Sequence, residues 1–166
     1  RMTLAARLNH VRALENQLPI AKLRVVYAAS GTLPAAVIVE DTRAIVEHGI
    51  YWAAIPNPTE ARFLAAILNS EAVRVRVAPL QPKGQGGARH FDKLVWELRI
   101  PRFDSGIALH RALAAAGAEA ERLAAAVPLT NGAYFTHRRR AIRGALRQSG
   151  IADKIDGLVG RLVPAP

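Results

Sequence analysis

The stretch IYWAAIPNPTEARFLAAILNS, residues 50–70, predicts a strand followed directly by an amphipathic helix. Its first part, 50–55, follows a glycine and is rich in the aromatic and β-branched residues typical of strands. Asn57 is a good helix N-cap, Pro58 suits the first helical position, and Glu60 completes an arrangement similar to a capping box. An apolar face at helical spacing follows, made of Phe63, Leu64, Ile67 and Leu68.

Further strands are predicted on both sides of this unit. LRVVYAASG (23–31) and PAAVIVE (34–40) are β-branched runs separated by Gly31 and Pro34, and LVWELRIP (94–101) reads as a later strand. Because the connections are short, neighbouring strands are expected to be antiparallel. The sequence therefore predicts an α+β fold with a small mixed, partly antiparallel sheet and flanking helices.

The segment EAVRVRVAPL, residues 71–80, fits two structures. Its valines alternate with arginines at the period of a strand, yet it follows a predicted helix and could continue as a second one. Helix and strand both stay open for residues 71–78.

Four other segments show helical periodicity: residues 2–18, about 108–127, 137–148 and 151–162. The second is the longest and has a heptad-like spacing with small residues in its middle. It can pack on its own domain, or it can act as a spacer or dimer contact, with a helix–helix partner bound through 109–127. The seam consists of Leu109, Leu113, Ala116, Ala120, Leu123 and Val127.

This pattern predicts an α/β domain, residues 1–103, which includes the N-terminal helix. A C-terminal helical segment, residues 104–166, is expected to pack on it, so that the two form one compact unit. Aromatic residues make up only 5% of the chain, which favours a helix-rich core. No apolar run is long enough to span a bilayer, so we expect no membrane partner and a cytoplasmic protein. Because the sequence begins at Arg1 rather than an initiator Met, we expect a fragment of a larger protein or a processed chain.

The net charge of +10 is concentrated in two parts of the chain. Residues 74–102 and residues 136–166 each carry a net charge of +5, whereas the rest of the chain is close to neutral. Such clustering is typical of proteins that bind a polyanion.

The first basic part contains the glycine-rich loop PLQPKGQGGARHF, residues 79–91. It lacks the third glycine of a dinucleotide fingerprint and a helix directly behind it, which argues against a nucleotide phosphate loop. Its side chains suit duplex DNA instead, because amides pair with adenine, arginine pairs with guanine, lysine contacts phosphate, and glycines allow close approach to a groove. The predicted contacts are Gln81 and Gln85 to adenine, Arg89 to guanine and Lys83 to phosphate, with Gly84, Gly86 and Gly87 in the backbone and His90 beside them.

The second basic part contains a predicted helix with an arginine stripe. Helical spacing places Arg139, Arg140, Arg143 and Arg147 within one arc, and we expect Ile142, Ala145 and Leu146 to point away from it. Such a stripe can follow a row of phosphates, whereas a solvated face or a docking surface for an acidic domain is the alternative.

No catalytic or metal-binding set can be assembled from the sequence. The five histidines are far apart, cysteine is absent, and no nucleophile–histidine–acid pattern is present. We therefore expect no catalytic residue, no metal site and no cofactor in this chain.

The succession of LRVVYAASGTLPAAVIVE, IYWAAIPNPTEARFLAAILNS, PLQPKGQGGARHFDKLVWELRIPRFD and LHRALAAAGAEAERLAA resembles the C-terminal target-recognition region of bacterial N6-adenine DNA methyltransferases of restriction–modification systems. It is also similar to one half of a type I specificity subunit, in which a recognition domain precedes a coiled-coil spacer. The loop match covers Gln81, Lys83, Gly84, Gly87 and Arg89.

The resemblance implies that the chain reads duplex DNA for an upstream methyltransferase domain of the same protein, which would bind S-adenosylmethionine. Because the chain has neither an Asn-Pro-Pro-Tyr/Phe motif nor a cofactor-binding glycine motif, it should be non-catalytic by itself. The alternative is a protein-interaction or dimerisation module whose basic surfaces dock an acidic partner.

Overall fold

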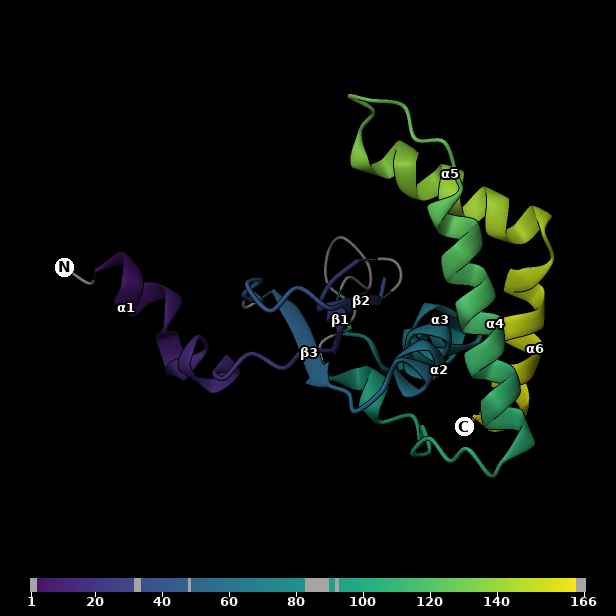
Figure 1. Ribbon diagram of the computed structural model, residues 1–166, viewed down its shortest axis with the longest axis horizontal. Helices are drawn as coiled ribbons and strands as arrows, with labels where there is room; N and C mark the ends of the chain where they lie inside the picture. The colour runs from purple at the N-terminus through teal and green to yellow at the C-terminus, as the bar shows by residue number, and fades with distance from the viewer. Residues whose placement is uncertain (1–2, 32–33, 48, 83–89, 92, 164–166) are drawn as a thin grey trace.

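The structure is a computed structural model that describes residues 3–31, 34–47, 49–82, 90–91 and 93–163. A small sheet, a middle pair of helices and an outer group of helices follow one another across the molecule (Figure 1). The strands are β1 (Arg24–Ala28), β2 (Val37–Val39) and β3 (Ile50–Ala54). The helices are α1 (Leu4–Leu8), α2 (Pro58–Asn69), α3 (Glu71–Val77), α4 (Ala108–Ala125), α5 (Phe135–Gln148) and α6 (Ile151–Leu162).

The predicted α+β class is confirmed. The three strands lie in the order β2-β1-β3, and both pairings are antiparallel, so the described part of the sheet has no parallel component. The central strand β1 is covered on both faces, since four of its residues in a row are buried. This burial on both faces explains why its sequence is continuously apolar except for Arg24.

The two faces of β1 are covered by different parts of the chain. Val25 and Tyr27 belong to the core shared with the helices, and the Tyr27 ring stacks on Tyr51 of β3 with centroids 5.3 Å apart. On the other face Arg24 is 1% exposed, and its Nη2 donates to the carbonyl oxygens of Asp41 and Ala44 at 2.8 and 2.9 Å. These hydrogen bonds of the buried Arg24 guanidinium hold the connection between β2 and β3 against this face of the sheet.

Helix α2 begins as predicted. The Asn57 side chain accepts from the backbone N–H of Glu60 at 2.9 Å, and Pro58 occupies the first helical position. The apolar face of the helix is buried at Phe63, Ile67 and Leu68, with Leu64 packed beside them.

Residues 71–77 form a helix, which resolves the segment that the sequence left open between helix and strand. Ser70 is the cause, because its Oγ accepts from Val73 N at 3.1 Å and donates to Ile67 O at 2.7 Å. One side chain thus ends α2 and caps α3. The neighbouring Asn69 exchanges two hydrogen bonds with the backbone of Ala36, which ties the helix pair to the segment before β2.

Helix α4 packs directly on α2. At their closest approach, a Cβ added to Gly117 would lie 2.5 Å from the carbonyl oxygen of Arg62, so only glycine fits. An ion pair between Arg62 Nε and Glu121 Oε2, 2.9 Å apart, lies beside this contact. Leu113 and Ala116 of the predicted seam are fully buried here, so the middle of the seam packs on helices of the same chain, whereas Leu109, Ala120, Leu123 and Val127 are half-buried.

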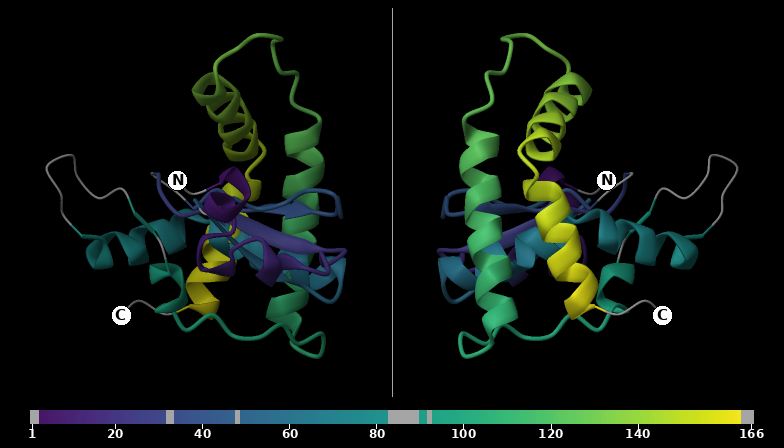
Figure 2. Two further views of the ribbon diagram at one scale, coloured as in Figure 1. Left: turned by 90° about the vertical axis from the view of Figure 1, so that its left-hand side faces the viewer. Right: turned by 90° about the vertical axis from the view of Figure 1, so that its right-hand side faces the viewer.

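Helix α6 runs beside α4 and completes the helical layer (Figure 2). It buries Ile151, Ile155 and Val159, and its Asp156 Oδ1 accepts from the backbone N–H of Ala72 in α3 at 3.2 Å. The same hydrophobic cluster contains residues from both sides of position 103, so the parts before and after it share a core.

The predicted continuous helix over residues 2–18 is wrong. The chain forms α1 and two short 3₁₀ turns, His10–Arg12 and Glu15–Gln17, and Val11 inside the first turn has a φ of 52°. Asn9 is the physical reason, because its Oδ1 accepts from the backbone N–H groups of Leu14 and Glu15 and so offers an alternative to helical hydrogen bonds. This segment extends away from the body of the molecule (Figure 1).

The predicted strand over residues 94–101 is also wrong. Leu94–Trp96 form a 3₁₀ turn, which continues through a hydrogen bond from Glu97 N to Leu94 O at 3.1 Å. The buried residues are Val95 and Leu98, three positions apart, which is the spacing of a helical turn rather than a strand.

Gly117→Ala is expected to destabilise the fold by about 1–3 kcal/mol, because its methyl group would meet backbone that has to move. Gly144→Ala is the matched control in another helix, where an added Cβ has no atom within 4 Å among the described residues. It should stabilise by about 0.5–1 kcal/mol. Urea denaturation of the two variants measures both effects, and equal stability of both would contradict the close α2–α4 contact.

Candidate nucleic-acid interface

The arginine-rich helix α5 lies across the top of α4 at the edge of the molecule (Figure 1). All of its 14 residues are described, and none of them is fully buried. Ile142 and Leu146 are half-buried toward the body, and Leu146 packs against the hydrophobic core. The helix is therefore held along one side and leaves the rest of its surface accessible.

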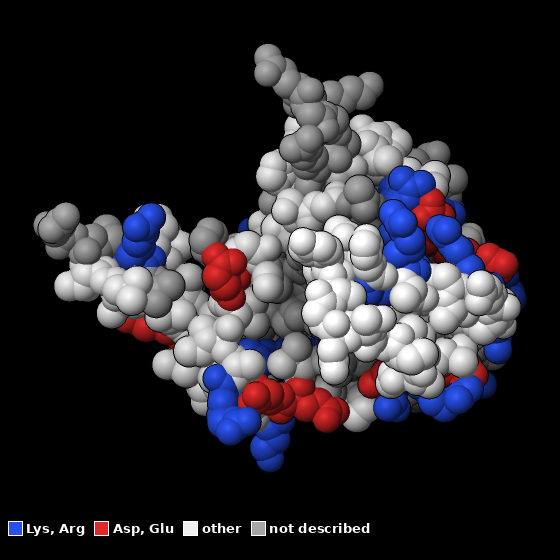
Figure 3. Space-filling model, turned by 90° about the horizontal axis from the view of Figure 1, so that it is seen from above, with Lys and Arg blue, Asp and Glu red and all other residues white. Residues whose placement is uncertain are grey.

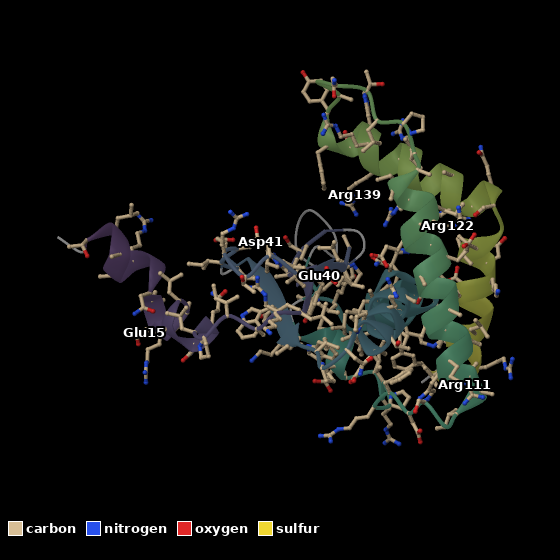
Figure 4. All side chains as sticks on the ribbon, viewed as in Figure 1. Glu15, Glu40, Asp41, Arg111, Arg122 and Arg139 are labelled. Carbon is tan, nitrogen blue, oxygen red and sulfur yellow. The ribbon has the colours of Figure 1, made fainter. Side chains whose placement is uncertain are left out.

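The four predicted stripe residues do not form one uniform face. Arg140 and Arg147 are exposed, whereas Arg139 and Arg143 are half-buried. Arg139 lies three residues before Ile142 and seven before Leu146, so it borders the packed side of the helix instead of opposing it. It points from α5 toward the body of the molecule (Figure 4). The expectation that the apolar residues point away from all four arginines is wrong for Arg139.

Arg143 is in an unfavourable electrostatic environment. Partial burial lowers the pKa of its guanidinium, and the neighbouring positive charges of Arg139 and Arg147 lower it further. Glu71 acts in the opposite direction, and Arg74 adds another positive charge. An added anion at this position would relieve repulsion between arginines that the fold has brought together.

Glu71 is the acidic group in this environment, and it comes from α3. Both the Nε and the Nη2 of Arg74 donate to its carboxylate, the former at 2.7 Å. This hydrogen bonding lowers the pKa of Glu71, and the charges of Arg147 and Arg143 lower it as well. We call Arg74, Arg139, Arg143 and Arg147 the α3–α5 arginine cluster.

The α3–α5 arginine cluster has an excess of positive charge, since the guanidiniums of Arg74, Arg143 and Arg147 act on the single Glu71 carboxylate and the charge of Arg139 acts on Arg143. Seen from above, Lys and Arg side chains gather along one side of the half that carries α5, with acidic side chains among them (Figure 3). A broad uncharged area lies next to them (Figure 3). Arg74 was not among the predicted contacts, because its proximity to α5 depends on residues 71–77 being helical.

Arg138 adds a further guanidinium at the beginning of α5. It is half-buried, and its Nε is shielded from solvent without a hydrogen-bond partner among the described residues. A buried donor of this kind is stabilised when an acceptor is supplied.

The glycine-rich loop is closed at its base by hydrogen bonds. Gln81 Nε2 donates to the carbonyl oxygen of His90 at 2.9 Å, and His90 pairs with Ser30 in an antiparallel bridge. The next residue, Phe91, is 1% exposed and donates its N–H to Ala29 O at 2.7 Å. The stem is thus fixed to the end of β1.

This geometry changes what the loop residues can do. Gln81 is 8% exposed with its amide used inside the stem, so it holds the loop instead of facing a base. His90 is exposed at the stem, where it can contact a ligand. The other predicted loop contacts, Lys83, Gly84, Gln85, Gly86, Gly87 and Arg89, lie outside the described residues.

Helix α3 connects the two predicted contact regions. It carries Arg74 toward α5, and a 3₁₀ turn, Ala78–Leu80, leads from its end into Gln81 at the loop stem. The structure therefore brings the stem and the arginine helix onto a common support, although they are about 50 residues apart in the sequence.

Other chemistry is not assembled in the part of the chain that the structure describes. It contains no group of His, Asp and Glu residues that could hold a metal ion. His110 is buried between Phe63 and Phe103, and its Nδ1 accepts from Asp104 N at 2.9 Å, so it is a core residue. Among the described helices, none is long and apolar enough to cross a membrane.

Comparisons with protein-family models, with curated proteins and with solved structures found no match for this chain.

Proposed function

We propose that this chain binds duplex DNA and serves as the target-recognition region of an N6-adenine DNA methyltransferase of a restriction–modification system. The observation that carries the proposal is the α3–α5 arginine cluster, in which guanidiniums from two helices crowd around one carboxylate. The sequence motifs of the loop and of the strands and helices before it supply the resemblance to recognition regions.

The cluster suits a row of phosphates better than a single small anion. Its arginines are spread over successive turns of α5 and one turn of α3, so they can contact more than one phosphate along a backbone. Arginine offers several fixed donors to phosphate oxygens, and partial burial strengthens such contacts. Binding through this surface would be largely independent of sequence.

Sequence reading is assigned to the loop of residues 79–91. Gln85 and Arg89 are the proposed base contacts, Lys83 is the proposed phosphate contact, and the exposed His90 lies at the stem. Arginines on α5 would then position the duplex, while the loop distinguishes one site from another. The stem hydrogen bonds support this division, because they fix where the loop leaves the body.

The reaction belongs, in this proposal, to another domain. A methyltransferase domain upstream in the same protein would bind S-adenosylmethionine and methylate an adenine that leaves the helix stack. The present chain would be non-catalytic and would act in the cytoplasm, where chromosomal and incoming DNA are both accessible.

Duplex binding should weaken steeply with salt, because each neutralised phosphate contributes a slope of about −0.9 in log affinity against log salt. Arg143→Ala should remove about one phosphate contact, which reduces the magnitude of the slope by about 0.9, and it should lower the affinity for all sequences alike. Arg111→Ala is the matched control, since Arg111 is an exposed arginine at the opposite end of α4 (Figure 4). Fluorescence anisotropy with a labelled duplex over a series of salt concentrations measures these slopes.

The outcomes of that titration separate the two classes of function. Absence of duplex binding at low salt would contradict the proposal. Binding of polyglutamate as tightly as duplex DNA, with the same response to Arg143→Ala, would favour the alternative of a module that docks an acidic protein.

Glu71→Gln is expected to increase duplex affinity by about two- to fivefold, because it removes the negative charge that faces the arginines and releases Arg74. Glu119→Gln is the control, since Glu119 makes the same type of ion pair with Arg122, three residues later, on α4. The lowered pKa of Glu71 keeps it ionised at neutral pH, so affinity of the unmodified chain should rise as pH falls through that pKa. Glu71→Gln should lack this rise in affinity at low pH. Equal duplex affinities of Glu71→Gln and Glu119→Gln would exclude Glu71 from the interface.

Arg89→Ala should relax sequence preference at one base pair by about 1–3 kcal/mol without changing the salt slope strongly. Selection of bound duplexes from a randomised pool compares this variant with Arg143→Ala. The same loss of preference in both variants would contradict the division between reading and positioning.

A further inference from the structure

The two most exposed aromatic side chains are neighbours in the sequence. Tyr134 is 78% and Phe135 is 67% exposed, whereas the next, Trp96, is 45% exposed and its ring contacts Tyr27. Aromatic residues are scarce in this chain, and the others that the structure describes are at least partly covered. Solvent exposure of two adjacent rings therefore requires an explanation.

These rings lie where α5 begins. The connection from α4 to α5 forms the highest point of the molecule in Figures 1 and 2, and Tyr134 immediately precedes α5. Leu129, in the same connection, is 41% exposed. The connection and the start of α5 thus carry an exposed apolar tip, made of Leu129, Tyr134 and Phe135, next to the arginines of α5.

The tip is partly ordered by contacts with basic side chains. The guanidinium of Arg139 lies over the Phe135 ring, 5.3 Å from its centroid, and the Tyr134 ring meets His137 edge-on with centroids 6.1 Å apart. Such contacts reduce the number of orientations available to the rings while leaving most of their surface accessible. Because the rings are already partly ordered in the free protein, they lose less conformational entropy when they insert into a ligand.

We propose that Tyr134 and Phe135 form a wedge that inserts between two neighbouring base pairs of the bound duplex. There the bases no longer stack on each other, and the rings stack on the exposed base. The inference rests on the proposed function and adds a second mode of contact to it. Arginines of α5 hold the phosphates on either side, and the rings take the place of a neighbouring base.

Apolar rings suit this role because they offset the free-energy cost of deforming DNA. Separating two stacked base pairs costs a few kcal/mol, and apolar side chains inserted at the step offset that cost. Aromatic rings stack on any base, so the wedge needs no sequence preference of its own. A protein that prepares adenine for methylation gains from this, because the target base has to leave the stack.

A lipid surface is a less suitable ligand for the same tip. A helix that lies on a membrane needs an apolar face along its length. The apolar side of α5 is turned to the protein, with Ile142 and Leu146 half-buried, so only its first residues are available. The charge beside the tip matches closely spaced phosphates flanking a small apolar opening.

The test compares a matched duplex with one that contains a central abasic site, whose stacking is already broken. We expect the unmodified protein to bind the abasic duplex about tenfold more tightly, since the energy of unstacking is no longer spent. Phe135→Ala and Tyr134→Ala should each reduce that preference by about fivefold or more, with an unchanged salt slope. Leu4→Ala is the control, because Leu4 is 74% exposed at the far end of the molecule.

A second readout uses duplexes with the fluorescent base 2-aminopurine placed at successive positions. Protein binding should increase its emission at one or more positions, and Phe135→Ala should abolish the increase. Unchanged emission with normal duplex affinity would overturn the wedge and leave the proposed function intact. Absence of duplex binding by the unmodified protein would overturn both the wedge and the proposed function. If Phe135→Ala weakened binding to phosphatidylserine vesicles but did not change DNA binding, the tip would be a lipid contact instead.

Discussion

The close contact between α2 and α4 at Gly117 is the constraint on which the rest of the structure depends. An added methyl group would lie 2.5 Å from the Arg62 carbonyl oxygen, so the two helix backbones touch almost directly. Small residues on both sides, including Ala66 and Ala116, allow this approach. Helix α2 can therefore pack on the sheet through one side and on α4 through the other, which produces a layered molecule with a single shared core.

The position of the arginine cluster follows from this layering. Ser70 starts α3 where α2 ends, and Asp156 of α6 holds the first turn of α3 through Ala72. Since α6 packs on α3, α4 and α5, it brings the charged side chains of α3 and α5 close enough to influence one another. Burial of apolar residues on α3 and α6, together with Leu146 of α5, holds these like charges near one another.

Local signals in the sequence were sufficient for some elements and insufficient for others. Asn57 and Pro58 defined the start of α2 because capping is a local interaction, and the β-branched runs gave all three described strands. Periodicity left residues 71–77 open between helix and strand, and it assigned residues 94–101 to a strand although the buried Val95 and Leu98 belong to a helical turn. Ser70 was the readable sign for the former, and the spacing of Val95 and Leu98 has meaning only once both are known to be buried.

The candidate interface was only partly readable for the same reason. The stripe on α5 was visible as a charge pattern, but the half-burial of Arg139 and the contribution of Arg74 require the positions of α3 and the core. Hydrogen–deuterium exchange of the chain with and without a duplex tests whether the arginine cluster and the loop bind DNA as one surface. DNA should protect α3, α5 and residues 79–91 together, while α1 and the N-terminal end of α4 stay unchanged. Protection confined to α1 or to the N-terminal end of α4, or no protection at low salt, would contradict it.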